Sequence, residues 1–127
     1  MTEAKDLPYA GRCFHRHRTL AVAALQLHRE LATVHADADL FRMGATCMRI
    51  AAQNALQTSD PQQMLRSWRE CALAERQIRL ATFRALRAGC IDKRRYDELF
   101  SLARLTARTR EDERQRIRRK ILQMDLV

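Results

Sequence analysis

Glycine and proline are scarce in this sequence of 127 residues, which contains three glycines and two prolines. Folds with many β-turns need these residues at positions with special backbone angles, so their scarcity argues against a β-rich fold. Alanine, leucine and arginine dominate instead, and all three are good helix formers. The composition therefore predicts an all-α protein.

Long apolar runs and paired cysteines are also missing. No run of about 18 or more apolar residues occurs, so we expect no membrane span. The N-terminus lacks the apolar core of a signal peptide, so we expect a cytoplasmic protein. The cysteines are scattered singly, whereas zinc sites use closely paired ligands. We expect no metal or cofactor and four free thiols that are buried or half-buried, at Cys13, Cys47, Cys71 and Cys90.

The clearest helix signal lies within residues 59–100. Asp60 is a good N-cap, Pro61 suits the first helical position, and Gly89 can adopt the left-handed conformation that ends a helix. Asp92 is then placed to open the next helix. An apolar stripe at three- and four-residue steps is expected at Met64, Leu65, Trp68, Cys71, Ala72, Glu75, Ile78, Thr82, Ala85 and Leu86.

Three further helices are expected, over about residues 9–34, 40–57 and 93–122, after a disordered lead of residues 1–8. Their core stripes are Leu20, Ala24, Leu27, Leu31 and Val34 in the first helix, Leu40, Met43, Cys47, Ile50, Ala51 and Asn54 in the second, and Tyr96, Leu99, Phe100, Ala103, Thr106, Ile117 and Ile121 in the fourth.

The expected connections are short. Residues 35–39 form the first turn, where Asp37 or Asp39 can cap the second helix. Helices joined by loops of about two to six residues run antiparallel to their sequence neighbours. The sequence therefore predicts a single domain over residues 9–127, an antiparallel up-down-up-down four-helix bundle.

The formal charge of +9 is unevenly distributed. Residues 1–60 hold seven Lys or Arg against six Asp or Glu, whereas residues 61–127 hold seventeen against nine. A basic face on the third and fourth helices would bind phosphate backbones in a salt-sensitive way. Because the few aromatic residues mostly fall on core stripes, base stacking is poorly supported. The candidate nucleic-acid-binding residues are Arg66, Arg69, Arg76, Arg79, Arg84, Arg87, Arg104, Arg108, Arg114, Arg118, Arg119 and Lys120.

Charged residues occupy stripe positions in two helices. Glu75 needs a buried partner, and an arginine from a neighbouring helix can serve. In the fourth helix, charge stands where the core stripe should continue. This segment is either a solvated, salt-bridged helix end or a contact with another subunit or a polyanion. The candidate subunit interface consists of Arg110, Glu113, Arg114 and Ile117.

Two Arg–His pairs, Arg12/His17 and Arg29/His35, resemble the Arg–x(4–6)–His motif of helical HEPN ribonucleases. Cys13 and Glu30 stand where that motif has its characteristic polar residue just after the arginine. The chain also has no Gly-rich phosphate loop and no nucleophile elbow. We therefore assign no catalytic residue and expect a protein that is not an enzyme, with a HEPN-like ribonuclease as an alternative.

Three segments, Leu73–Glu75, Ala88–Ile91 and Tyr96–Leu99, resemble motifs of the four-helix bundle family named for rRNA intervening-sequence proteins. Relatives in that family include the Avd accessory proteins of diversity-generating retroelements. The second helix departs from the family pattern, with Ala52 in place of a proline and only Asn54 and Ala55 matching. The resemblance implies a cytosolic bundle that forms a ring of five subunits with a basic surface. In the Avd branch it also implies binding to nucleic acid and to a reverse transcriptase.

The most direct functional hypothesis is a non-enzymatic oligomeric module that binds RNA, DNA or a nucleic-acid-handling protein through its basic surface. The main alternative is a purely structural protein–protein scaffold whose charge serves only solubility and assembly.

Overall fold

The computed structural model describes residues 9–125, which form four α-helices and no strand. The expected all-α class and the four helices are therefore confirmed for this part of the chain, whereas the expected disordered lead lies outside the described residues. The helices are α1 (Tyr9–Leu31), α2 (Asp39–Gln57), α3 (Pro61–Arg87) and α4 (Lys93–Asp125).

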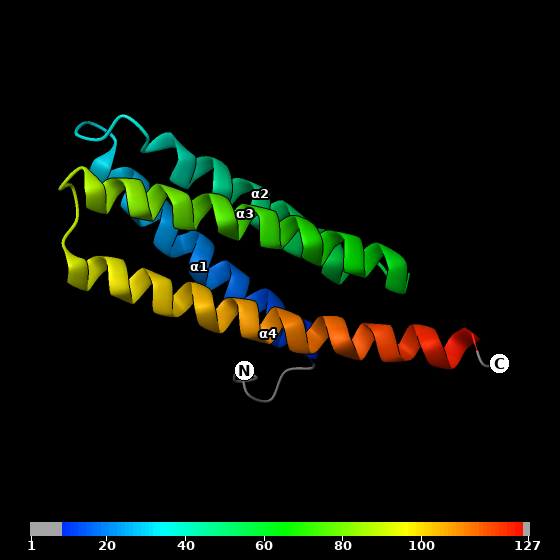
Figure 1. Ribbon diagram of the computed structural model, residues 1–127. Helices are drawn as coiled ribbons and strands as arrows, with labels where there is room; N and C mark the ends of the chain where they lie inside the picture. The colour runs from blue at the N-terminus through cyan, green and yellow to red at the C-terminus, as the bar shows by residue number, and fades with distance from the viewer. Residues whose placement is uncertain (1–8, 126–127) are drawn as a thin grey trace, which may run out of the picture.

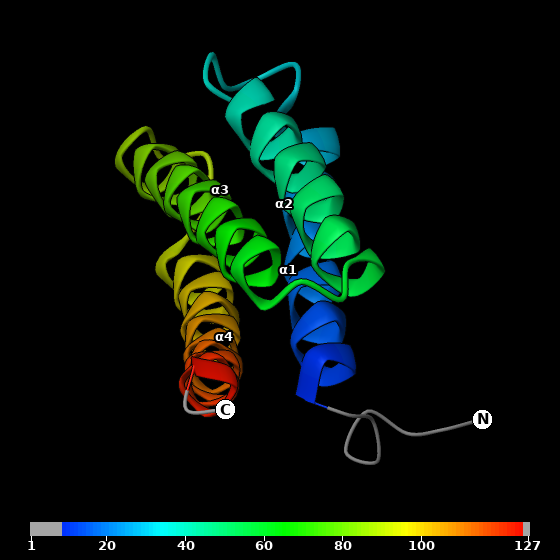
Figure 2. The same cartoon turned by 90° about the vertical axis from the view of Figure 1, so that its right-hand side faces the viewer.

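Each helix packs mainly against two others. α1 and α3 both contact α2 and α4, and Figure 2 shows the four helices around a common centre. The α1–α2 and α3–α4 loops lie at one end of the molecule, and the α2–α3 loop lies at the other (Figure 1). α4, with 33 residues, extends past the other helices at its C-terminal end (Figure 1).

The ends of α3 and the start of α4 follow the sequence signals. Asp60 caps α3 through its side chain, and Pro61 occupies the first turn. Gly89 has a φ of +74°, the left-handed conformation expected after the last turn. The Asp92 carboxylate accepts the backbone N–H of Arg95 at 2.8 Å. These local signals are sufficient to place all three helix ends.

The start of α2 differs from the expectation. Ala38 occupies the N-cap position, and no side chain caps the helix there. Asp37 pairs instead with Arg84 of α3 at 3.6 Å, and Asp39 with His28 of α1 at 3.1 Å. The expected cap at Asp37 or Asp39 is wrong, because both carboxylates form contacts with other helices.

The inward face of α2 also differs. Met43, Cys47, Ile50 and Asn54, expected in the core, are exposed. A Cβ atom at Gly44 would lie 2.7 Å from Ile78 Cγ1, so α2 approaches α3 closely through its small residues. Met43, Cys47 and Ile50 are consequently turned outward. The buried residues of α2 are Phe41, Gly44, Ala45, Met48, Ala51, Ala52 and Ala55.

The core forms two apolar clusters. One includes Leu20, Phe41 and Ile78 and lies toward the α1–α2 loop; the other surrounds Trp68 at the opposite end. The expected stripes of α1, α3 and α4 are largely buried or half-buried. Val34 is the exception on α1: it is 66% exposed because the helix ends before it.

Candidate nucleic-acid interface

A layer of buried charge crosses the bundle between the two apolar clusters. Arg110 of α4 donates from Nη1 to Oε1 of Glu75 in α3 at 2.8 Å, and the two side chains are 8% and 6% exposed. Arg79 pairs with the other carboxylate oxygen at 3.0 Å. The expected arginine partner for Glu75 is therefore confirmed. That partner, Arg110, is one of the residues that the sequence predicts in a subunit interface.

The other residues of the predicted subunit interface are also mostly buried inside the bundle. Glu113 is 1% exposed and is bound by the guanidinium of Arg116 at 2.6 and 3.2 Å. Ile117 is 1% exposed as well. A subunit contact through Arg110, Glu113 and Ile117 is thus wrong, because this stripe faces its own bundle. Only Arg114 remains partly exposed, and the helix becomes largely solvated only beyond Ile117.

His17 joins the buried layer from α1. Its Nε2 lies 3.2 Å from Arg110 Nη1, and its Nδ1 lies 2.7 Å from the backbone oxygen of Cys13. A guanidinium can only donate, so Nε2 accepts and the Nδ1–H group donates, which makes the imidazole neutral. Desolvation by burial lowers the pKa of His17 to about 4, and the nearby Arg110 charge acts in the same direction.

The buried His17 makes stability depend on pH. The pKa of His17 rises from about 4 in the folded chain to the ordinary 6.5 on unfolding. Between these values the unfolded state binds more protons, so stability is complete above pH 6.5 and falls as the pH drops toward 4. We expect a loss of about 3 kcal/mol over this window. Urea unfolding at about pH 7 and 4.5 should show a smaller pH dependence for His17→Gln; an equal dependence in both proteins would contradict this.

The basic residues of α3 divide between two sides of the helix. Arg84 pairs with Asp37 of the α1–α2 loop, which places it on the α2 side. Arg66 precedes Arg84 by about five helical turns and therefore shares that side. The guanidinium of Arg79 lies 5.6 Å above the ring of Phe100 in α4, on the opposite side. The arginines of α3 therefore extend over more than one side of the helix, and their assignment to a nucleic-acid-binding surface stays a prediction.

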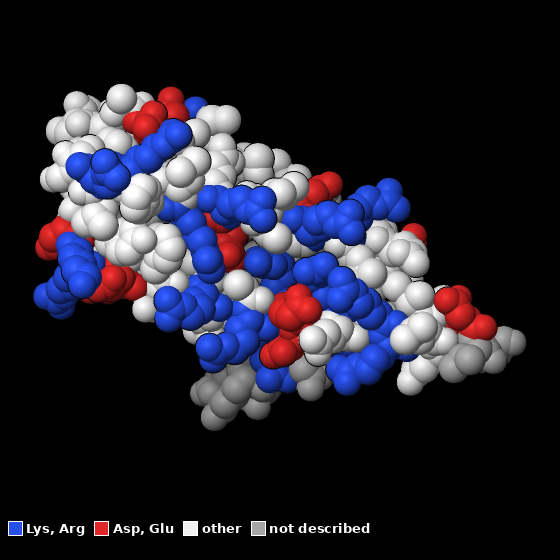
Figure 3. All heavy atoms as spheres, viewed as in Figure 1, with Lys and Arg blue, Asp and Glu red and all other residues white. Residues whose placement is uncertain are grey.

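The larger group lies over α3 and α4. Figure 3 shows Lys and Arg side chains gathered over these two helices, with an acidic island among them. We define the α3–α4 face by the six arginines whose helical positions lie on or beside the α3–α4 contact, namely Arg69, Arg76, Arg79, Arg104, Arg108 and Arg118. Five of the six, all except Arg79, are exposed and have no ion-pair partner among residues 9–125.

The remaining candidate residues lie near this face or on the end of α4. Arg87 lies 5.8 Å above the ring of Phe83, and Arg114 pairs with Glu111 at 3.3 Å. Arg119 and Lys120 are exposed on the part of α4 that extends past its neighbours.

Aromatic side chains contribute little to this surface. Trp68 is fully buried. Phe100 stacks on Tyr96 with ring centroids 4.4 Å apart and is covered by Arg79 on α3. Phe83 is 43% exposed. Because Arg79 lies over the ring of Phe100 and Arg87 over the ring of Phe83, the face offers guanidinium groups rather than a platform for stacking bases.

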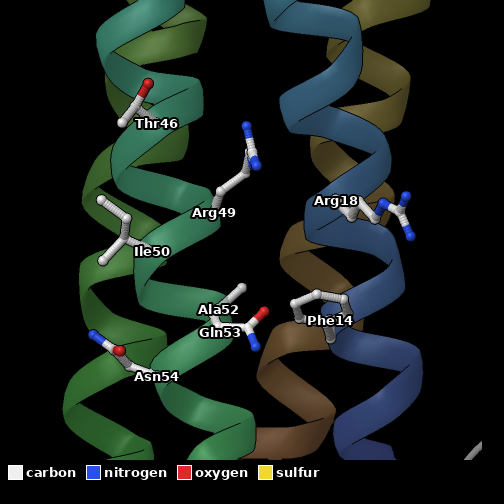
Figure 4. A pocket seen from close by; sticks show the side chains of 8 residues that line it. All are labelled: Phe14, Arg18, Thr46, Arg49, Ile50, Ala52, Gln53 and Asn54. Carbon is white, nitrogen blue, oxygen red and sulfur yellow. The ribbon is translucent and has the colours of Figure 1, made fainter.

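A cleft of about 590 Å³ lies between the first half of α1 and the second half of α2. Phe14 and Arg49 extend into the space between the two helices, whereas Ile50 and Asn54 lie on the far side of α2 (Figure 4). The lining contains two arginines and no carboxylate. It is a shallow basic depression with no pair of groups suited to acid–base chemistry.

The two HEPN-like pairs have different environments. His17 is fully buried with both ring nitrogens in contact, so the Arg12/His17 pair presents no imidazole to solvent. His35 lies in the turn after α1, and its Nε2 is buried without a hydrogen-bond partner. Arg29 is exposed. A HEPN-like role for the Arg29/His35 pair stays a prediction.

Residues 9–125 contain no group of three or more His, Cys, Asp or Glu placed to hold a metal ion. None of their helices is long and apolar enough to cross a membrane. The chain matched no protein-family model, no curated protein and no solved structure. The resemblance to the rRNA intervening-sequence family therefore stays a prediction.

Proposed function

We propose that the protein binds the phosphate backbone of nucleic acid through the α3–α4 face. The observation that supports this is the set of five exposed arginines on two adjacent helices with no carboxylate partner in the described chain. Arginine's planar group matches phosphate geometry, and an unpaired guanidinium keeps its full charge for a ligand.

The dimensions of the face suit a phosphate backbone. Arg69 and Arg76 are about 10 Å apart along α3, and Arg104 and Arg118 about 21 Å apart along α4, at 1.5 Å per residue. A duplex strand presents one phosphate per 3.4 Å of axis, so a face of this length spans about six phosphates. Binding would be governed by charge and shape, with little base recognition.

The proposal extends to assembly. The alternating loop positions in Figure 1 support an antiparallel up-down-up-down order. We propose a cytoplasmic homo-oligomer, as the family resemblance implies, with a mass near five times 14.8 kDa for a ring of five. Several copies would present several basic faces and raise the affinity for a long polyanion by avidity. In the Avd-like case a reverse transcriptase would share the bound nucleic acid.

Charge reversal on the face tests the proposal. Arg69→Glu/Arg76→Glu/Arg104→Glu should weaken binding to a duplex at low salt by about 100-fold or more, because three phosphate contacts become repulsive. The matched control is Arg29→Glu/Arg42→Glu/Arg94→Glu, which changes the net charge equally at exposed positions outside the face. Fluorescence anisotropy of a labelled duplex measures binding by both variants, and circular dichroism confirms that both are folded.

The control decides how the result is interpreted. It should bind within about fivefold of the parent protein, since long-range charge effects are partly screened. An equal loss in both variants would mean that net charge, not this face, drives binding. A folded parent protein that fails to bind at low salt would favour the structural scaffold.

A further inference from the structure

The cleft between α1 and α2 lies on the side of the bundle opposite the α3–α4 face. Since α1 and α3 each pack against both α2 and α4, the α1–α2 pair and the α3–α4 pair form opposite sides (Figure 2). The volume of the cleft, about 590 Å³, falls within the range of small-molecule sites. A ligand in this cleft would not compete with nucleic acid on the α3–α4 face.

The lining of the cleft carries positive charge without a carboxylate. Arg18 and Arg49 line it, and both are exposed with no ion-pair partner among residues 9–125. The first carboxylate of α1 is Glu30, and the only one of α2 is Asp39. Along the helices these lie about 15–18 Å from the two arginines, which exceeds the screening length of about 8 Å at physiological salt. The two guanidinium groups therefore keep their charge for a ligand.

The two arginines stand at the same level of the bundle. His28 of α1 and Asp39 of α2 are in contact at 3.1 Å beside the loop that joins these helices. Ten residues further from that loop along each helix are Arg18 and Arg49. In Figure 4 Arg49 extends toward α1, whereas Arg18 is directed away from α2. Because no partner holds Arg18 there, its flexible side chain can turn over the cleft toward an anion.

The floor of the cleft is apolar and packed against the core. Phe14 and Ala52 line it, and both belong to or pack against the apolar cluster around the fully buried Trp68. Figure 4 shows Phe14 and Gln53 extending into the space between the two helices, each one turn from an arginine of its own helix. The half-buried phenyl ring offers a surface for a planar group, and the Gln53 amide offers both a donor and an acceptor.

We propose that the α1–α2 cleft binds a nucleoside monophosphate, with its phosphate between Arg18 and Arg49 and its base against Phe14. A phosphate monoester carries about −1.5 to −2 charges at pH 7, which matches two guanidinium groups, whereas a carboxylate would neutralise only one. Gln53 can hydrogen-bond to the base or the ribose. The cleft lining holds no pair of groups suited to acid–base chemistry, so the ligand is bound and not turned over. This site is independent of the proposed function.

Isothermal titration calorimetry with adenosine monophosphate and with adenosine tests the phosphate contact. The parent protein should bind adenosine monophosphate with a Kd below about 1 mM, and at least about tenfold more tightly than adenosine. Arg18→Gln/Arg49→Gln should weaken binding of the monophosphate by about tenfold or more and leave adenosine within about twofold. The matched control, Arg29→Gln/Arg42→Gln, removes two exposed charges from the same helices near their loop. It should bind the monophosphate within about twofold of the parent.

A substitution at Phe14 tests the base contact. Phe14→Leu keeps an apolar side chain against the Trp68 cluster and removes the aromatic ring. Binding of adenosine monophosphate should weaken by about fivefold or more, because stacking on the ring is lost. Ribose 5-phosphate, which has no base, should bind the parent and Phe14→Leu equally. An equal loss for both ligands would overturn the placement of the base against Phe14.

The same chemical group ends a 5′-phosphorylated strand, and a second comparison separates the two sources. Trinucleotides with and without a 5′ phosphate are titrated against Arg69→Glu/Arg76→Glu/Arg104→Glu, in which the α3–α4 face repels phosphates. Binding of the 5′-phosphorylated trinucleotide that is tighter than binding of adenosine monophosphate would assign the cleft to strand ends. The reverse order would assign it to free nucleotides.

The outcomes for the cleft and for the α3–α4 face are distinguishable. A parent protein that binds adenosine monophosphate no more tightly than adenosine would overturn the cleft proposal, and so would equal binding by Arg18→Gln/Arg49→Gln. The charge-reversal variant of the α3–α4 face should bind adenosine monophosphate within about threefold of the parent. The cleft variant should in turn bind a duplex within about fivefold of the parent. Loss of duplex binding in the parent alone would refute the proposed function and leave the cleft proposal standing.

Discussion

Replacing Glu75 with alanine is expected to lower the free energy of unfolding by about 3–5 kcal/mol, because it leaves a buried cation without its counter-charge. Arg110 is 7% exposed, and its Nη1 group hydrogen-bonds to Glu75 and to the neutral ring of His17. In Glu75→Ala the guanidinium must either stay unpaired or draw water into the bundle. Urea unfolding at pH 7 measures the loss.

A double variant separates lost charge pairing from lost packing. Glu75→Leu/Arg110→Met replaces the pair with apolar groups of similar size and should recover most of the stability lost in Glu75→Ala. Part of the loss in the free energy of unfolding will remain, because Nε2 of His17 then lacks the Arg110 guanidinium as its hydrogen-bond donor. A loss below about 1 kcal/mol in Glu75→Ala, or a double variant no better than the single one, would contradict a buried ion pair at this position.

Truncation of Trp68 is the second large effect that we expect. Its side chain is fully buried in the cluster at the α2–α3 end, and its ring lies 5.2 Å from the ring of His17. Trp68→Ala should cost about 3–5 kcal/mol, since it removes a large apolar group and leaves a cavity. Thermal unfolding followed by circular dichroism measures the change.

Trp68→Phe is the informative control for this site. The indole Nε1 is buried and has no hydrogen-bond partner among residues 9–125. Phenylalanine keeps most of the apolar volume and removes that unpaired donor. The free energy of unfolding should therefore fall by less than about 1.5 kcal/mol. If Trp68→Phe were as damaging as Trp68→Ala, an unrecognised role of the indole N–H would have to be considered.

The sequence was a sufficient guide where local chemistry decides the structure. Asp60, Pro61, Gly89 and Asp92 define helix ends through caps and backbone angles that depend on a few neighbouring residues. Helix number and class followed from composition and periodicity. These features need no knowledge of the tertiary partner.

The orientation of α2 could not be settled in the same way. This helix carries two apolar stripes, and periodicity alone does not decide between the stripe of Met43, Cys47 and Ile50 and the stripe that is buried. The structure instead buries the side of Gly44, because close packing against Ile78 needs a residue without a Cβ atom. A run of small residues on one side was the signal that favoured close approach.

The buried charge layer was found only in part. The sequence indicates that Glu75 needs an arginine, but charge at Arg110 and Glu113 is equally typical of a solvated helix end or a subunit contact. Two opposite charges on the core stripes of neighbouring helices would have indicated an internal pair. His17 was considered only as half of a catalytic motif, because nothing local shows that α4 supplies its donor.

The most direct test of the central claim is a salt series with the parent protein and a short DNA or RNA duplex. If the five unpaired arginines of the α3–α4 face contact phosphates, the logarithm of the binding constant should fall linearly with the logarithm of salt concentration, with a slope of about −4 to −5. The charge-reversal variant should show a much shallower slope. No binding at low salt, or binding that does not change with salt, would contradict a phosphate-binding face.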